Sequence, residues 1–223
     1  IGAGAPTKAG THSVHGAPLG TEELAAAKAA VGWPNEMFHV PGEVRAYFAQ
    51  VAERGASDRR RWESMMSEWR MAHPDRAALW DKHWAHAVPD DFLAQLEGAV
   101  AGQVNATRSL SGAIIQKATA LMPALIGGAA DLEPSTKTGV KGAASIVPAS
   151  VESDTLPDAS FAGQNLHFGI REHAMGWMAN GMLCYGGWRT YNATFLVFSD
   201  YMRAPVRIAA LSHLPTIFVF THD

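Results

Sequence analysis

Short apolar runs alternate with helical patterns along the second half of the chain. Strands are expected at residues 125–130, 165–169, 188–195 and 215–221, and helices at 106–122, 171–185 and 200–211. Apolar runs of this length, bounded by turn residues, are typical of strands buried on both faces. Because strands and helices alternate, the pattern predicts an α/β fold, a parallel sheet with helices on both faces. Ligands are then expected at the carboxyl ends of the strands.

The segment before this sheet is expected to be mostly helical. An alanine-rich helix is predicted to begin with Thr21 as its N-cap, followed by two acidic residues. A second helical stretch covers residues 41–84, with interruptions predicted near Gly55 and at His73–Pro74. The chain therefore changes from a helical part to an alternating part.

A Val-Pro-Asp-Asp stretch at residues 88–91 has the composition of a linker. It predicts two domains, residues 1–88 and residues 89–223, with the second truncated at its C-terminal end. The chain opens on Ile1 without a methionine and closes on an apolar strand. We expect a fragment of a longer protein, with any targeting segment outside it.

Tryptophan and methionine residues cluster on helical faces in the first part of the chain. Trp62, Met65, Met66 and Trp69 share one face. Trp80 and Trp84 share another. An aromatic cofactor site is conceivable, but this spacing favours packing in a hydrophobic core.

The composition excludes some partners. With 18 basic and 21 acidic residues the formal net charge is −3, which provides no basic surface for nucleic acid. No apolar run reaches the about 18 residues that a membrane span needs. The single cysteine, Cys184, excludes an internal disulfide framework, fits a reducing compartment and is expected to pack in a helix end. Partners should be small molecules or protein.

Glu172 is the residue whose position most needs an explanation. It falls in the first turn of a predicted helix, directly after a predicted strand, with Phe168, Met175 and Trp177 around it in sequence. One interpretation is a carboxylate that is stabilised by the positive end of the helix. The other is a carboxyl group that keeps its proton in an apolar pocket and donates it to a ring nitrogen.

Two histidines, His12 and His15, lie in a glycine-rich loop near the start of the chain. Three interpretations are open for this pair. They could be metal ligands, surface residues of a turn, or donors to a bound anion or a reacting oxygen.

Four motifs occur in an order that resembles the transketolase family. The motifs are Gly10-Thr-His-Ser-Val-His-Gly16, Ala106-Thr-Arg108, Gly128-Ala-Ala-Asp-Leu-Glu-Pro-Ser135, and Gly169-Ile-Arg-Glu-His-Ala-Met-Gly176 followed by Thr194-Phe-Leu-Val-Phe198. The likeness runs nearly end to end, over the end of a diphosphate-binding domain and most of a pyrimidine-binding domain. It implies the thiamine-diphosphate-binding fold. The segment from residue 137 to residue 160 has no clear match.

The resemblance implies thiamine diphosphate as cofactor and assigns residues to it. Glu172 would be catalytic, hydrogen-bonding a ring nitrogen of the aminopyrimidine, and Phe198 would stack on that ring, with Phe195 and Tyr201 nearby. A core phenylalanine is the alternative for both phenylalanines. Asp131 resembles the family's acid beside the cofactor.

The resemblance also implies how a sugar phosphate is bound. Arg108 and Ser135 resemble the pair that holds the phosphate, since a guanidinium and a hydroxyl suit a dianion. His15 resembles the catalytic histidine that reaches both the diphosphate and the substrate oxygens. His12 is the less favoured of the two histidines for that role.

The implied activity is transfer of a two-carbon ketol unit from a ketose phosphate to an aldose phosphate, in the pentose phosphate pathway. A cytoplasmic homodimer is implied, with the active site at the subunit interface. Mg²⁺ is implied as well, but no Gly-Asp-Gly signature occurs here, so its ligands are expected outside this chain, which alone should be inactive.

Three other functions remain as alternatives. Dihydroxyacetone synthase and deoxyxylulose-phosphate synthase use the same cofactor, and the second is disfavoured by the Arg-Glu-His order and the Gly-Thr-His loop. A binding or assembly fragment that keeps the pyrimidine half-site without turnover is the third.

Overall fold

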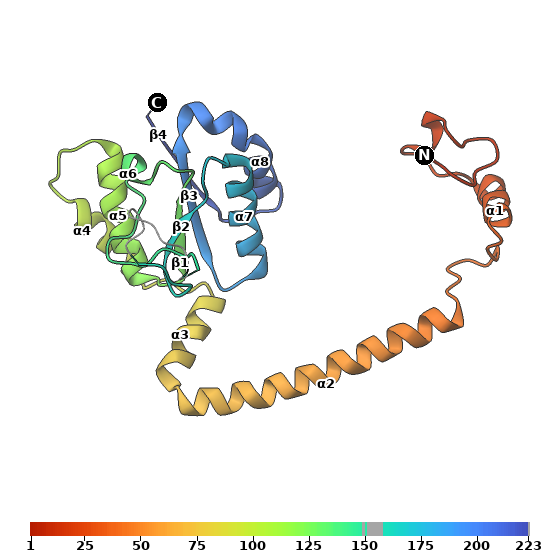
Figure 1. The fold of residues 1–223 in the computed structure, drawn as a ribbon, viewed down its shortest axis with the longest axis horizontal. Coiled ribbons are helices and arrows are strands. Elements are labelled where there is room, and N and C mark those ends of the chain that lie inside the picture. The colour runs from red at the N-terminus through yellow and green to blue at the C-terminus, as the bar shows by residue number, and fades with distance from the viewer. Residues whose placement is uncertain (149, 151–157, 223) are drawn as a thin grey trace. The chain divides into compact units, whose positions relative to one another are not determined.

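The computed structural model describes residues 1–148, 150 and 158–222, which form two compact units, residues 1–69 and residues 70–223 (Figure 1). The boundary predicted from the sequence, between residues 88 and 89, stays a prediction. Among the described residues, none of the helices combines the length and the apolar character that crossing a lipid bilayer needs.

The first unit contains a short 3-10 helix, η1 (His12–Val14), followed by α1 (Thr21–Ala30). Thr21 is the first helical residue and Gly20, at φ 89°, occupies the N-cap position without a side-chain bond, so the predicted cap was wrong. The Glu23 carboxylate instead accepts hydrogen bonds from the backbone amides of Thr7 and Lys8. These bonds, with that of Thr7 first, lower the pKa of Glu23 and fasten the N-terminal loop to α1.

A long helix, α2 (Gly42–Ala72), connects the units and is followed by α3 (Pro74–Trp84). The predicted interruption near Gly55 is absent from this helix, since one glycine costs only about 1 kcal/mol in a helix interior. The interruption at His73 was correct, because Pro74 cannot continue the preceding helix.

The tryptophan and methionine face of α2 is not part of a core. None of the residues of α2, all of which the structure describes, is buried, and Trp62 and Met65 are 49% and 56% exposed. The prediction of core packing was therefore wrong for this helix. Periodicity shows which side chains share a face but not whether anything covers it.

The second unit is built around a four-stranded sheet with strand order β2-β1-β3-β4. The strands are β1 (Leu125–Ala129), β2 (Asn165–His167), β3 (Arg189–Phe195) and β4 (Ile217–Thr221). All three pairings are parallel. The predicted parallel sheet is confirmed.

Helices cover both faces of this sheet, as predicted. They are α4 (Phe92–Val100), α5 (Thr107–Leu121), α6 (Glu133–Thr136), α7 (Glu172–Tyr185), the 3-10 helix η2 (Leu196–Met202) and α8 (Arg203–Leu211). Figure 1 shows α4 and α5 on one side of the sheet and α7 and α8 on the other. The single helix predicted at residues 200–211 is in fact the end of η2 followed by α8.

Each face of the sheet has its own hydrophobic core. One core holds Ile115 and Ala118 of α5 against Leu125 and Tyr191. The other is formed by Ala130, Phe168, Met175 and Met202. The Tyr191 hydroxyl donates to the Thr138 carbonyl oxygen at 2.8 Å, and burial raises the pKa of this tyrosine, which keeps its proton for that bond.

Two further expectations concern the edges of this unit. Cys184, near the end of α7, is exposed, so the prediction that it packs in the interior was wrong. Of the unmatched segment 137–160, residues 149 and 151–157 lie outside the described residues. In its described part Ser145 forms isolated parallel bridges with Ala159 and Asn165.

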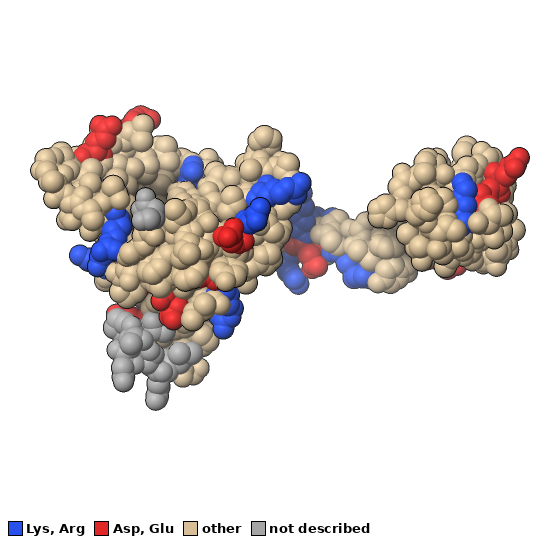
Figure 2. All heavy atoms as spheres, turned by 90° about the horizontal axis from the view of Figure 1, so that it is seen from above, with Lys and Arg blue, Asp and Glu red and all other residues tan. Residues whose placement is uncertain are grey.

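Charged side chains are spread thinly over the surface. On the face drawn in Figure 2, Lys and Arg side chains are interspersed with Asp and Glu. On α2, Arg59 pairs with Glu63 at 2.8 Å and Arg61 with Asp58 at 3.2 Å. This surface provides no extended field of one sign, in agreement with the net charge of −3.

Two glycines of α7 give a matched test of this packing. A Cβ atom at Gly176 would lie 2.7 Å from Cγ of Pro205 in α8, whereas one at Gly181 would meet nothing within 4 Å. Gly176→Ala should therefore lower the free energy of unfolding by about 1–3 kcal/mol through overpacking. Gly181→Ala should raise it by about 0.5–1 kcal/mol through helix propensity.

Urea unfolding followed by circular dichroism measures both variants. An equal response of the two would contradict the close approach of α7 and α8 at Gly176.

Candidate functional site

The carboxyl ends of the four strands bring most candidate residues to one edge of the sheet. Asp131 follows β1, Glu172 follows β2, Phe195 ends β3, and His222 follows β4. Because the strands are parallel, these ends lie on the same side. The loops that hold Asp131 and Ser135 follow β1 and the loop before Glu172 follows β2, so all three leave the carboxyl ends where ligands were expected.

Glu172 is the first residue of α7 and is only 7% exposed. Gly169, at φ 65°, makes the turn from β2 toward the helix, which a residue with a side chain would rarely do. The Arg171 guanidinium then folds back and donates to the Phe168 carbonyl oxygen at 2.8 Å. The result is a carboxylate held at a helix N-terminus, beneath the protein surface.

A buried threonine of the sheet fixes the orientation of this carboxylate. Thr194, which is fully buried in β3, donates from its hydroxyl to Oε1 of Glu172 at 3.3 Å. Met175, also fully buried, lies one helical turn further along α7. The structure thus contains the feature on which each of the two interpretations of Glu172 rests. The residue lies at a helix N-terminus, and an apolar side chain follows it one turn along the helix.

Aromatic rings and Glu172 line a common cavity of about 400 Å³. Phe198 and Tyr201 of η2 form one wall, with ring centroids 6.2 Å apart. Phe195 stacks behind Phe198 at 6.1 Å, with an angle of 11° between the planes. Such a cavity offers a flat heteroaromatic ring both a stacking surface and a carboxylate at its edge.

A second cavity, of about 320 Å³, lies between the start of α5 and the end of β4. Arg108, in the first turn of α5, donates from Nη1 to Nε2 of His222. The imidazole that accepts this bond carries its proton on Nδ1, which lies 2.8 Å from the Thr221 hydroxyl. Guanidinium and imidazole together make this cavity suitable for an anion.

Phe195 connects the two cavities. Its ring packs against Phe198, at 6.1 Å between centroids, and against the His222 ring, at 4.1 Å. The two groups of residues, one suited to an aromatic ring and one to an anion, are therefore separated by a single side chain.

His222 and Thr194 were both missed in the sequence analysis. His222 lies 114 residues from Arg108 in the sequence, so no local pattern joins them. A polar residue directly after an apolar strand was the available signal, because the carboxyl ends of parallel strands are where ligands bind. Thr194 is within a quoted motif but was not assigned a role.

Asp131, Ser135 and the two histidines are the remaining predicted residues. Asp131 is exposed and has φ 61°, while Ser135 lies in α6 and lines neither the Glu172 cavity nor the Arg108 cavity. His12 and His15 are exposed residues of the first unit. Within the described ranges, no three His, Cys, Asp or Glu side chains are grouped so that they could hold a metal ion.

The bond between Thr194 and Glu172 can be tested by a double-mutant cycle. Thr194→Val should lower the free energy of unfolding by about 1–3 kcal/mol, because a buried carboxylate loses a hydrogen-bond donor. The loss should be smaller in a Glu172→Gln background, since a neutral amide makes a weaker bond than a carboxylate. If the losses in the free energy of unfolding of the two single variants add up to that of the double variant within about 0.5 kcal/mol, the two side chains do not interact.

Two family models match the chain. The model described as "Transketolase, thiamine diphosphate binding domain" matches residues 1–89. The model described as "Transketolase, pyrimidine binding domain" matches residues 103–223, which include both cavities.

Curated relatives and solved structures agree with these matches. The chain is 44% identical to a transketolase of Geobacillus stearothermophilus and 41% identical to one of Mycobacterium tuberculosis, covering 100% of this chain and 32% of each relative. A structure titled as transketolase from Pichia stipitis in complex with sedoheptulose-7-phosphate has a TM-score of 0.79 at 32% identity, over 93% of this chain and 30% of that one. A transketolase structure from Campylobacter jejuni has a TM-score of 0.74 at 31% identity, and the match covers 100% of this chain and 32% of that one. The chain thus spans about a third of the length of the curated relatives it matches.

Proposed function

Since the chain belongs to the transketolase family, we propose that it is the part of a transketolase that holds the pyrimidine of thiamine diphosphate and binds a sugar phosphate. The reaction is the transfer of a two-carbon ketol unit from a ketose phosphate to an aldose phosphate. The observation that carries the proposal is the buried Glu172 carboxylate in one cavity with Phe198 and Tyr201.

The residues of this cavity fit an aminopyrimidine ring. Phe198 supplies a stacking face, and the Glu172 carboxyl group lies where it can exchange a hydrogen bond with a ring nitrogen. Thr194 donates its hydrogen bond to Oε1 of Glu172, so the Oε2 atom remains available to the cofactor. When bound, thiamine diphosphate supplies the nucleophilic carbon and the electron sink that let a ketose carbon–carbon bond break. Asp131, at the adjacent strand end, is the further acid that we assign to the cofactor.

We assign the second cavity to the phosphate of the substrate. Arg108 offers a forked pair of donors, and the adjacent His222 accepts one hydrogen bond from it and so positions the guanidinium. Ser135 is retained as a further phosphate ligand. His15, and less favourably His12, are assigned to the substrate oxygens, with His15 also reaching the diphosphate.

The half-site is open to solvent, which supports a homodimer with the active site at the subunit interface. Ile170 and Tyr201, at the mouth of the Glu172 cavity, are 79% and 62% exposed. A second protein surface over these side chains would exclude water from the reacting atoms. We propose that the ligands of Mg²⁺ lie outside this chain and that its two domains are residues 1–88 and 89–223. We also propose that the enzyme is cytoplasmic.

Intact mass of the native protein together with ketol-transfer assays separates the remaining alternatives. The proposal expects a longer chain whose activity depends on both thiamine diphosphate and Mg²⁺. A preference for formaldehyde as acceptor would indicate dihydroxyacetone synthase. A native protein that ends at these residues and shows no turnover would indicate a non-catalytic half-site.

Glu172→Gln in the complete enzyme tests the cofactor assignment. The variant should fold and bind sugar phosphate, yet lose most of its ability to activate the cofactor, because an amide cannot share a proton with the pyrimidine nitrogen. Hydrogen–deuterium exchange at the thiazolium carbon measures this step, with Glu97→Gln on the exposed face of α4 as control. Exchange at the wild-type rate would refute the assigned role.

Arg108→Ala and His222→Ala test the phosphate assignment. Arg108→Ala should raise KM for phosphorylated acceptors by roughly 10- to 100-fold, the value of a charge-assisted hydrogen bond. His222→Ala should raise it less, because it removes only the hydrogen-bond partner that positions the guanidinium. Unphosphorylated acceptors should be almost unaffected, because these groups lie away from the Glu172 cavity. The exposed Arg207→Ala is the matched control. An equal rise in KM for phosphorylated and unphosphorylated acceptors would contradict the assignment of this cavity to the phosphate.

A further inference from the structure

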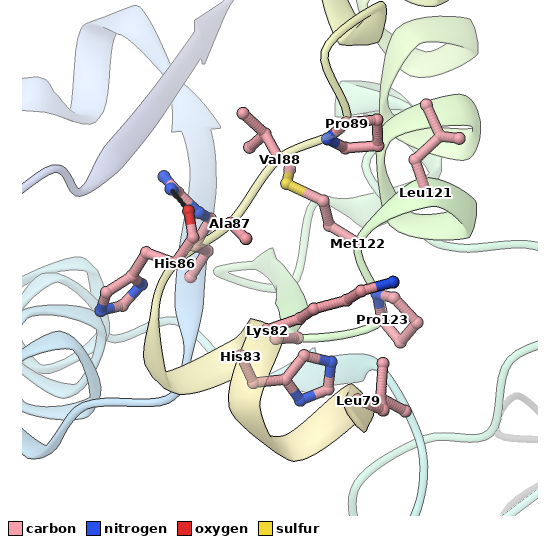
Figure 3. Close-up of a pocket in the computed structure, with 12 residues that line it drawn as sticks. Leu79, Lys82, His83, His86, Ala87, Val88, Pro89, Leu121, Met122 and Pro123 are labelled. Carbon is pink, nitrogen blue, oxygen red and sulfur yellow. Dashed lines mark hydrogen bonds between the residues drawn. The ribbon is translucent and has the colours of Figure 1, made fainter. Parts of the chain in front are cut away.

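A third cavity, of about 230 Å³, lies at the opposite edge of the sheet (Figure 3). It is bordered by the end of α3, the connection from α3 to α4, and the residues that lead into β1. Arg189, the first residue of β3, closes it at the sheet. Its position at the amino ends of β1 and β3 separates it from the Glu172 and Arg108 cavities, which lie at the carboxyl ends.

The polar groups of this cavity are basic. Lys82 and Arg189 line it, and no carboxylate of the residues that the structure describes does. Among the described residues, neither of these two side chains belongs to an ion pair. The Arg189 guanidinium donates one bond, from Nη2 to the His86 carbonyl oxygen at 2.6 Å, which fixes its position.

His83 adds an unsatisfied polar atom. Its Nε2 atom is buried and has no hydrogen-bond partner, which is costly for a buried nitrogen. Burial lowers the pKa of His83, so the ring is mainly neutral at pH 7 and one of its nitrogens can donate. Figure 3 shows this ring beside Leu79, with the Lys82 side chain extending across the pocket.

The remaining walls are apolar. Leu79, Leu121 and Met122 line them, together with Val88 and Pro89 of the connecting segment. Within the described part of the chain, no Ser, Thr, Asn or Gln side chain lines the cavity, so a sugar or another polyhydroxylated molecule would leave its hydroxyl groups unpaired. The cavity is smaller than the about 300–1,000 Å³ that is typical of sites for drug-sized ligands.

We propose that this cavity binds a small aliphatic monocarboxylate. Lys82 and Arg189 supply the positive charge that attracts the carboxylate, with His83 as a further donor, and the hydrocarbon tail lies against Met122 and Leu121. A cation would be repelled by the basic groups, and a neutral apolar molecule would leave them unpaired. The inference is independent of the proposed function, because it uses none of the residues assigned to cofactor or substrate.

The experiment titrates the full-length protein with sodium hexanoate, and with 1-hexanol and hexylammonium chloride as probes of the same tail without the negative charge. Binding is followed by the ¹³C-methyl resonance of Met122, which Met122→Leu identifies. Hexanoate should shift this resonance saturably, with an affinity at least about tenfold above that of hexanol, as expected for charge-assisted bonds. Hexylammonium should cause no saturable shift.

Variants locate the charge that is responsible. Lys82→Gln should weaken hexanoate binding by about tenfold and leave hexanol binding unchanged. Lys117→Gln, on α5 and outside the cavity, is the control and should bind hexanoate as the wild type does. An unmoved Met122 resonance, equal affinities for hexanoate and hexanol, or an unchanged affinity in Lys82→Gln would each overturn the proposal.

Discussion

The structure depends on the parallel direction of its four strands. In the order β2-β1-β3-β4, every strand ends at the same edge, so residues far apart in the sequence meet there. The buried bond from Thr194 to Glu172 joins two of these ends and orients the carboxylate on which the proposed chemistry rests. A carboxylate this deeply buried is tolerated because it has a hydrogen-bond donor and a helix N-terminus beside it.

Phe195 relates the two sides of the candidate site. It stacks on Phe198 of the Glu172 cavity and contacts His222, the acceptor of the Arg108 bond. In the proposed function, the cofactor ring and the substrate phosphate are therefore bound in two cavities whose residues both contact this one aromatic side chain. This separation lets the phosphate contribute binding energy without disturbing the reacting atoms.

The sequence predicted the sheet well and the first unit less well, for physical reasons. The buried strands are short apolar runs and the helix at 172–185 has apolar residues at helical spacing, and both patterns reflect the core that these elements form. The Trp62 face of α2 has the same kind of periodicity but lies in solvent, because spacing does not encode what covers a face. The N-cap at Thr21 was wrong by one residue, since Gly20 adopts a positive φ before the helix. In the site, Glu172 was found because its motif is local, whereas His222 was missed because its partner is distant in sequence.

The most direct test of the central claim is a crystal structure of the full-length protein with thiamine diphosphate, in which the distance from the Glu172 carboxylate to the nearest aminopyrimidine ring nitrogen is measured. We predict a hydrogen bond of about 2.6–3.2 Å, with the ring stacked on Phe198. A pyrimidine ring bound away from Glu172, with the carboxylate bonded only within the protein, would contradict it.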